Sequence, residues 1–264
     1  MSAVVDRALV LRLWDFSETS QTVALFCRER GLLRGLAKGA RRERGRFGGG
    51  FETLTLGEVV ALVKPSSELA TLTEWTALEM FWAARRDLRA HRIALYMIDL
   101  VFHGIIDHDP HTGLFDALVE HLRTLESPDR HAASLLSFQW RLLVEMGYKP
   151  ALGARSESND GRDRALLFDP LAGGVRSPGV QGSSVRPSQR GPAPEAACWA
   201  VRPQTVAVLR RLERDEDVTD SKEESVHVER ASRLLSEYLR VVLDRDLPTR
   251  HLLFGAGIGP RRPG

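Results

Sequence analysis

The sequence predicts an α+β protein in which a small β-barrel precedes a larger helical domain. Two patterns support this fold class. Residues 1–77 contain short apolar runs that are separated by turn residues and show no helical period. After Ala77 the apolar residues recur at the spacing of a helix face. We therefore expect one domain over residues 1–77 and a second over residues 78–264.

Five strands are expected in the first domain. Runs such as ALVLRLW and TVALFC are rich in strand-forming residues, and Pro65 and Ser66 supply a turn between the last two strands. A closed barrel such as the OB-fold leaves no strand edge exposed, so we expect the strands to close on themselves. The expected strands cover residues 8–14, 22–27, 32–37, 51–63 and 69–77.

The second domain is expected to be a helical bundle, because apolar faces at helical spacing are joined by short connections. Ser127 and Pro128 are typical of a helix start. Gly147 is expected to end the helix that follows them, and Pro248 to end the last helix. The apolar faces cover residues 93–101, 115–125, 135–146, 203–212 and 234–242.

Residues 151–197 differ in composition from both flanks. They include seven Gly, five Pro and six Ser, so they bury little apolar surface to offset the entropy of ordering. We expect a flexible insertion in which only residues 164–170, RALLFDP, form a short strand.

Composition limits the location and the redox chemistry. No window approaches the roughly 18 uncharged apolar residues that a membrane span needs. Asp6, Arg7 and Arg12 interrupt the apolar residues at the N-terminus, which is not typical of a signal peptide. We therefore expect a cytoplasmic protein.

Cys27 and Cys198 are the only cysteines, which excludes a disulfide framework and a cysteine-based zinc site.

Positive charge is concentrated between residues 28 and 46. This stretch holds eight basic and two acidic residues, whereas the whole chain has a net charge of +2. Neutralising phosphates releases counterions whatever the base sequence, so such a cluster suits non-specific binding to a nucleic acid. The glycines that follow allow a loop to approach a curved backbone closely. The expected phosphate contacts are Arg34, Lys38, Arg41, Arg42, Arg44 and Arg46.

Two residues in this stretch carry further expectations. Strand alternation places Arg34 on the face opposite Leu33. Phe47 is expected at the tip of the loop, where it would stack on a base, or, as an equal alternative, would fill the end of the barrel. We include Phe47 among the candidate DNA-binding residues.

Other interpretations of the charge stay open. The basic loop is also what a solvated surface loop or a docking site for an acidic partner protein would contain. A second basic patch lies near an expected apolar groove that would take an acidic peptide with a hydrophobic end, or it is a solvated helix face. This patch consists of Arg85, Arg86, Arg89 and Arg92.

A metal-dependent hydrolase is the remaining alternative. His103 and Asp107 stand at helical spacing, and His108 or His111 would supply a third ligand. Asp and His are equally common in a turn that ends a helix, which is the simpler interpretation of residues 107–110. The sequence also lacks the P-loop pattern of nucleotide hydrolysis. We therefore expect no catalysis and no cofactor.

The order ALVLRLWDFSETSQTVALFCRERGLLRGLAKGARRERGRFGG, residues 8–49, contains an AKGARR motif followed by glycines, and it resembles the N-terminal domain of the RecO family of bacterial recombination mediators. The segment FQWRLLVEMGYKP, residues 138–150, is similar to a helical segment of that family, and RLLSEYL, residues 233–239, to its closing helix. The motif positions that carry the N-terminal resemblance are Glu18, Thr19, Gly31, Ala37, Lys38, Gly39, Ala40, Arg41, Arg42, Phe47 and Gly48.

The resemblance implies a function in DNA repair and homologous recombination. It implies an OB-fold and a helical domain that bind single- and double-stranded DNA and anneal complementary strands. The implied partners are RecR, the C-terminal tail of single-strand-binding protein and, indirectly, RecA. These roles imply that the protein is cytoplasmic and associates with the nucleoid.

The resemblance also has one departure. Many RecO proteins carry a four-cysteine zinc site after the G-Y-x-P segment, whereas residues 153–157 and 176–179 contain no cysteine here. A zinc-free version is implied, in which the flexible segment 151–197 replaces the zinc-binding region.

Overall fold

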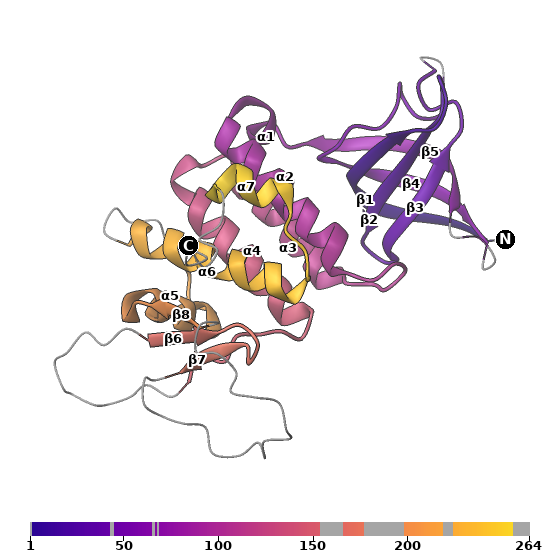
Figure 1. Ribbon diagram of the computed structural model, residues 1–264. Helices are drawn as coiled ribbons and strands as arrows, with labels where there is room; N and C mark the ends of the chain where they lie inside the picture. Colours follow the sequence, from indigo (N-terminus) through magenta and orange to yellow (C-terminus); the bar gives the residue numbers. More distant parts are fainter. Residues whose placement is uncertain are drawn as a thin grey trace, which may run out of the picture.

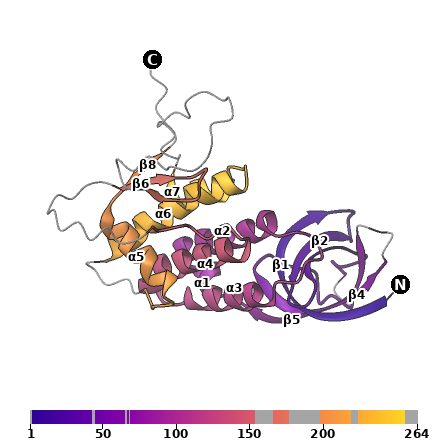
Figure 2. The same ribbon diagram turned by 90° about the horizontal axis from the view of Figure 1, so that it is seen from below.

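The computed structural model describes residues 2–42, 45–64, 67, 69–153, 166–176, 198–218 and 224–255. A β-barrel forms one end of the molecule, a group of helices forms the middle, and a small sheet lies on the far side of the helices (Figure 1). The same succession is seen from below (Figure 2). The predicted α+β fold is confirmed.

Five strands close into a barrel, as predicted, and their order around it is β1-β2-β3-β5-β4. The parallel pairing of β3 with β5 closes the barrel, and every other pair of neighbouring strands in the barrel is antiparallel. The last strand continues beyond residue 77, where we expected the domain to end. The strands are β1 (Ser2–Asp15), β2 (Gln21–Cys27), β3 (Gly31–Ala37), β4 (Thr55–Val63) and β5 (Ala70–Met80).

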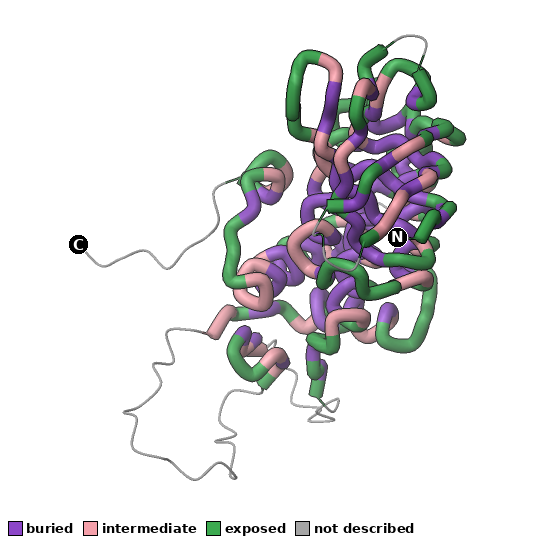
Figure 3. Tube along the Cα trace, turned by 90° about the vertical axis from the view of Figure 1, so that its right-hand side faces the viewer, coloured by how far each residue is buried: buried purple, intermediate pink, exposed green. Residues whose placement is uncertain are grey.

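The barrel interior is filled by alternate side chains of every strand, as the period of two requires. Buried residues gather inside the molecule and exposed residues lie on the loops around the barrel (Figure 3). Gly57 is needed on β4 because the ring of Trp75 lies where a side chain would be, 2.5 Å from an ideal Cβ. Interior residues include Val10, Val23, Leu25, Leu33, Val59, Leu72 and Trp75.

The helical domain contains every helix that the periodicity predicted. Among the described residues, no helix has the length and apolar character to cross a bilayer. The helices are α1 (Ala83–Arg86), α2 (Leu88–Gly104), α3 (Thr112–Thr124), the 3₁₀ turn η1 (Pro128–Arg130), α4 (His131–Glu145), α5 (Pro203–Glu213), α6 (Ser225–Val242) and α7 (Pro248–Phe254).

The prediction for Pro248 was wrong. The preceding helix α6 already ends at Val242, and Pro248 is the first residue of α7. Proline suits the first position of a helix, because its fixed φ is helical and its missing N–H would have no partner there.

Three short strands form a second sheet in the order β7-β6-β8. The predicted strand in residues 164–170 is confirmed as β6 (Leu166–Asp169), whereas β7 (Gly174–Arg176) and β8 (Trp199–Val201) were not predicted. Phe168 is fully buried and its ring stacks on Trp199 at 5.8 Å. The rest of the expected flexible insertion, residues 154–165 and 177–197, lies outside the described residues.

The barrel is fixed to the helical domain through the lower outer face of β1, β2 and β3. Phe26 meets Phe115 of α3 edge to face at 5.4 Å. The carbonyl of Leu32 accepts a hydrogen bond from the backbone N–H of His108 at 3.0 Å. Arg28 donates two hydrogen bonds to the Asp116 carboxylate, at 2.7 and 2.8 Å. Apolar packing and charged contacts together set the orientation of the two domains.

Candidate nucleic-acid interface

The basic stretch begins on β3, where the predicted alternation is confirmed. Leu33 is fully buried inside the barrel, and Arg34 is exposed on the outer face. The strand ends at Ala37, and the chain then crosses the end of the barrel before β4 begins at Thr55. We call residues 38–54 the barrel-end loop.

Apolar side chains and hydrogen bonds hold the barrel-end loop against the barrel. Ala40, Phe47 and Phe51 are all buried in the barrel core. The backbone N–H of Arg41 donates to the carbonyl of Thr19 at 3.1 Å, and the backbone N–H of Trp75 on β5 donates to the carbonyl of Arg46 at 3.0 Å. The loop is therefore anchored on the β1–β2 turn and on β5, and the side chains of Lys38, Arg41, Arg42 and Arg46 are exposed.

Phe47 does not lie at an exposed tip, which corrects the expectation that it stacks on a base. Only 6% of its surface is exposed, and its ring lies 5.7 Å from that of Phe51, which in turn packs on Trp75 at 4.9 Å. The structure therefore agrees with the alternative in which Phe47 fills the barrel end. The physical reason is that Phe47 joins Phe51 and Trp75 in the apolar core of the barrel.

Of the six expected phosphate contacts, the five that the structure describes divide into three groups. Lys38, Arg41 and Arg42 are exposed together where β3 ends, close to the β1–β2 turn. Arg46 is exposed beside β5, and Arg34 lies lower on the outer face of β3. Arg44 lies outside the described residues. The structure thus brings part of the predicted set together and spreads the rest along the barrel surface.

Three of these arginines already have carboxylate partners. Arg41 pairs with Asp15 at the end of β1. Arg34 pairs with Asp107 at 3.3 Å, and Arg46 with Glu74 at 3.3 Å. All six side chains are at least two-fifths exposed, and pairs of this kind contribute about 0 to 1 kcal/mol. Phosphate can therefore compete for these guanidinium groups at small cost.

Lys38 and Arg42 have no carboxylate partner among the ion pairs of the described residues. Arg42 folds back over Gly39, whose ideal Cβ would lie 3.4 Å from the Arg42 side chain, and Gly39 has a φ of +68°. A glycine at this position therefore permits both the turn and the close approach of Arg42.

The outer face of β1 carries residues that sequence reasoning did not single out. Arg12 pairs with the buried Asp99 of α2, and its guanidinium lies over the Phe102 ring at 4.5 Å. Trp14 is 43% exposed, with its ring 6.1 Å from that of Phe102. The alternation of Arg12 and Trp14 along β1 is the signal that predicts their common face.

The proposed metal ligands contact separate partners. His103 lies near Arg12 and Asp99, and burial lowers its pKa. Asp107 pairs with Arg34 of the barrel, and His111 contacts Glu145 at 3.0 Å. Across the part of the chain that the structure describes, no group of three or more His, Cys, Asp or Glu side chains could hold a metal ion. Residues 105–110 form the loop between α2 and α3.

Comparison with known proteins decides the family. Residues 1–81 match the family model described as "Recombination protein O N terminal", and residues 85–251 match "Recombination protein O C terminal". The chain belongs to the RecO family.

Several curated relatives named DNA repair protein RecO agree with this assignment. The protein from Salinibacter ruber is 32% identical over 94% of this chain and 92% of its own length. Those from Rhodopirellula baltica and from Anaeromyxobacter sp. strain Fw109-5 are each 34% identical, over 69% and 64% of this chain and 67% of their own lengths. The boundary between the two RecO models falls directly after β5.

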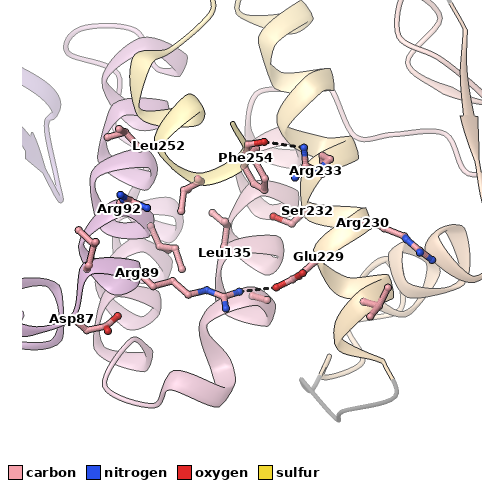
Figure 4. Close-up of a pocket in the computed structure, with 15 residues that line it drawn as sticks. Asp87, Arg89, Arg92, Leu135, Glu229, Arg230, Ser232, Arg233, Leu252 and Phe254 are labelled. Atoms are coloured by element: carbon pink, nitrogen blue, oxygen red, sulfur yellow. Dashed lines mark hydrogen bonds and ion pairs between the residues drawn. The ribbon is translucent and has the colours of Figure 1, made fainter. Parts of the chain in front are cut away.

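The RecO helical domain contains a groove between α2, α4, α6 and α7 (Figure 4). Its volume is about 670 Å³, and its apolar lining includes Leu135, Leu252 and Phe254. Of the second basic patch, Arg89 and Arg92 line this groove. Arg230 and Arg233 of α6, which were not predicted, supply further positive charge.

The other half of the second basic patch points elsewhere. Arg85 contacts Glu52 of the barrel-end loop at 3.0 Å and Thr55 at 3.2 Å. Arg86 lies over the ring of Trp82 at 5.2 Å. The patch is therefore two surfaces, one of which helps to join α1 to the barrel.

Proposed function

We propose that this RecO protein is a non-catalytic mediator of DNA repair and recombination that binds DNA through the barrel end. The observation that carries the proposal is the exposed group of Lys38, Arg41 and Arg42 on a loop anchored to the barrel. Lys38 and Arg42 lack carboxylate partners among the described residues, and the partner of Arg41 is itself exposed. Non-specific phosphate binding needs only such charges.

Annealing of complementary strands would follow from the same charges. Two single strands repel each other, and a cationic surface that binds both reduces this repulsion and raises their local concentration. In this proposal the annealing step needs no nucleotide. Binding to single- and double-stranded DNA alike would place the protein at the nucleoid.

The test is an annealing assay with two dye-labelled complementary oligonucleotides, together with binding titrations on each strand. We expect tight binding to both strands at low salt and faster annealing with protein than without it. If the protein binds neither strand at physiological salt, the barrel-end loop is instead a docking site for an acidic partner protein.

The arginine-lined groove supports a second part of the proposal, a site for the C-terminal tail of single-strand-binding protein. An acidic peptide with a hydrophobic end suits a groove whose walls carry Arg92 and Arg230 and whose lining includes Leu135. Arg89 also lies there, paired with Glu229 at 2.8 Å. The peptide's carboxylates would compete with Glu229 for this arginine.

Labelled tail peptide tests the groove directly. We expect Arg92→Ala to weaken peptide binding at least about fivefold, because it removes a charge-assisted contact. Arg86→Ala is the matched control, since Arg86 lies over Trp82 outside the groove. Equal effects of the two variants would place the tail elsewhere.

The proposed action with RecR and, indirectly, on RecA rests on family membership, and co-elution with RecR tests it.

A further inference from the structure

We propose that the upper outer face of β1, β2 and β3 binds single-stranded nucleic acid, with Trp14 as a base-stacking residue. The inference rests on the proposed function and adds an aromatic residue for base stacking, which the buried Phe47 does not provide. Charge alone holds a phosphate chain, whereas binding to single strands also uses aromatic platforms.

The strand register brings the relevant side chains onto one face. In an antiparallel sheet, residues directly opposite each other project to the same side. Successive rows on one face are two residues apart, or about 7 Å. Two such rows cross the face, namely Arg12, Ala24 and Arg34, and then Trp14, Thr22 and Leu36.

The row of Trp14, Thr22 and Leu36 is the accessible part of this face, because Phe102 of α2 contacts both Arg12 and Arg34 in the row below. Ala24 is fully buried and Thr22 is half-buried, whereas Trp14 on the neighbouring strand is 43% exposed. Phe16, which follows β1, is 63% exposed. Trp14 and Phe16 are therefore exposed aromatic rings at this end of the face.

The Trp14 ring is positioned by α2. It packs on Phe102 of α2 with an angle of 49° between the two ring planes. Phe102 is in turn held beneath Arg12, whose partner Asp99 also accepts a hydrogen bond from Thr249 at 2.6 Å. A ring that is already positioned loses little conformational freedom on binding, which favours its use as a platform.

The charge around Trp14 favours a polyanion over an apolar protein segment. On β3 the outward residues run Arg34, Leu36 and then Lys38, so the row leads directly to the barrel-end loop. Asp15, next to Trp14, is paired with Arg41. Glu18, in the following turn, is an exposed carboxylate at the rim of the face. A strand bound by Lys38 and Arg41 would therefore present its bases to Trp14.

The test compares a thymine oligonucleotide with an abasic strand of equal length and charge. Trp14→Ala is expected to weaken binding to the thymine strand about fivefold to a hundredfold, the usual effect of losing one stacking residue. The affinity for the abasic strand and the salt dependence of binding are expected to stay unchanged, because no charge is removed. Trp14→Phe should retain most of the affinity.

Trp82→Ala is the matched control, because Trp82 is also about half exposed and lies near an arginine but follows β5. Equal losses on both strands for Trp14→Ala would mean that Trp14 acts on the fold, which overturns the inference. Wild-type affinity in Trp14→Ala would also overturn it and leave this face for a protein partner. If the wild-type protein binds neither strand, the proposed function itself fails.

Discussion

Arg41 of the barrel-end loop is ion-paired with Asp15 at the end of β1, so a group proposed to bind phosphate is held by an exposed carboxylate. The pair fixes the position of the guanidinium without burying it, since the two side chains are 42% and 70% exposed. On DNA binding, a phosphate would replace the Asp15 carboxylate as the partner of Arg41. The displaced carboxylate would then lie close to the phosphate.

Asp15→Asn is therefore expected to tighten DNA binding. The substitution frees Arg41 and removes a negative charge next to the bound strand, with a gain of about two- to fivefold at low salt. Fluorescence anisotropy with a labelled oligonucleotide measures it. Glu58→Gln, on β4, is the control, and it should leave the affinity unchanged. A loss of affinity in Asp15→Asn would mean that the pair is needed to position Arg41.

Phe47→Ala is expected to destabilise the barrel by about 3 to 5 kcal/mol, the usual cost of removing a buried phenylalanine ring. Phe47 contacts Phe51 in the closed end of the barrel. Chemical denaturation measures the change. Phe16→Ala, which removes an exposed ring, should change stability by no more than about 0.5 kcal/mol. Wild-type stability in Phe47→Ala would show that the ring is not part of the core.

Acid should weaken the fold through His121. Burial lowers the pKa of His121 from 6.5 to about 4, and its Nδ1 lies 3.2 Å from the Ser134 hydroxyl. Between these two pKa values the unfolded chain binds a proton that the folded chain does not, so stability falls as the pH drops. His121→Gln should lose less stability than the wild type from pH 6.5 to pH 4. Identical pH profiles in thermal unfolding would contradict this.

The small sheet is expected to keep its stability without metal. Phe168 stacks on Trp199 and meets the Tyr238 ring edge-on at 5.2 Å, so apolar contacts hold β6 where we proposed a replacement for the zinc region. A chelator should leave the melting temperature unchanged, whereas Phe168→Ala should lower it, because it opens a cavity. A fall in melting temperature with the chelator would indicate a bound structural metal.

Local patterns predicted the parts of the interface that depend on neighbours in sequence. The strand period predicted that Leu33 and Arg34 lie on opposite faces. The positive charge of the loop follows directly from its amino-acid composition. Phe47 was different, because its ring packs on Phe51, which in turn packs on Trp75 of β5. No periodicity along the loop carries that contact.

The carboxylate partners were also beyond sequence reasoning. Asp15, Glu74 and Asp107 reach the basic stretch only after the barrel closes and docks on α2 and α3. The strands β7 and β8 escaped prediction for a related reason: each has three residues, too few to show a period, and both form by pairing with β6. Local sequence thus set the charge, and tertiary contacts set its distribution.

The salt dependence of single-strand binding tests the central claim most directly. Wild-type affinity should fall with salt concentration on a log–log plot with a slope of roughly −3 to −4, as for four to six phosphate contacts. Arg41→Ala combined with Arg42→Ala should weaken binding to all sequences alike and flatten the slope by about 1.4. An unchanged slope and affinity in the double variant would contradict a phosphate-binding site at the barrel end.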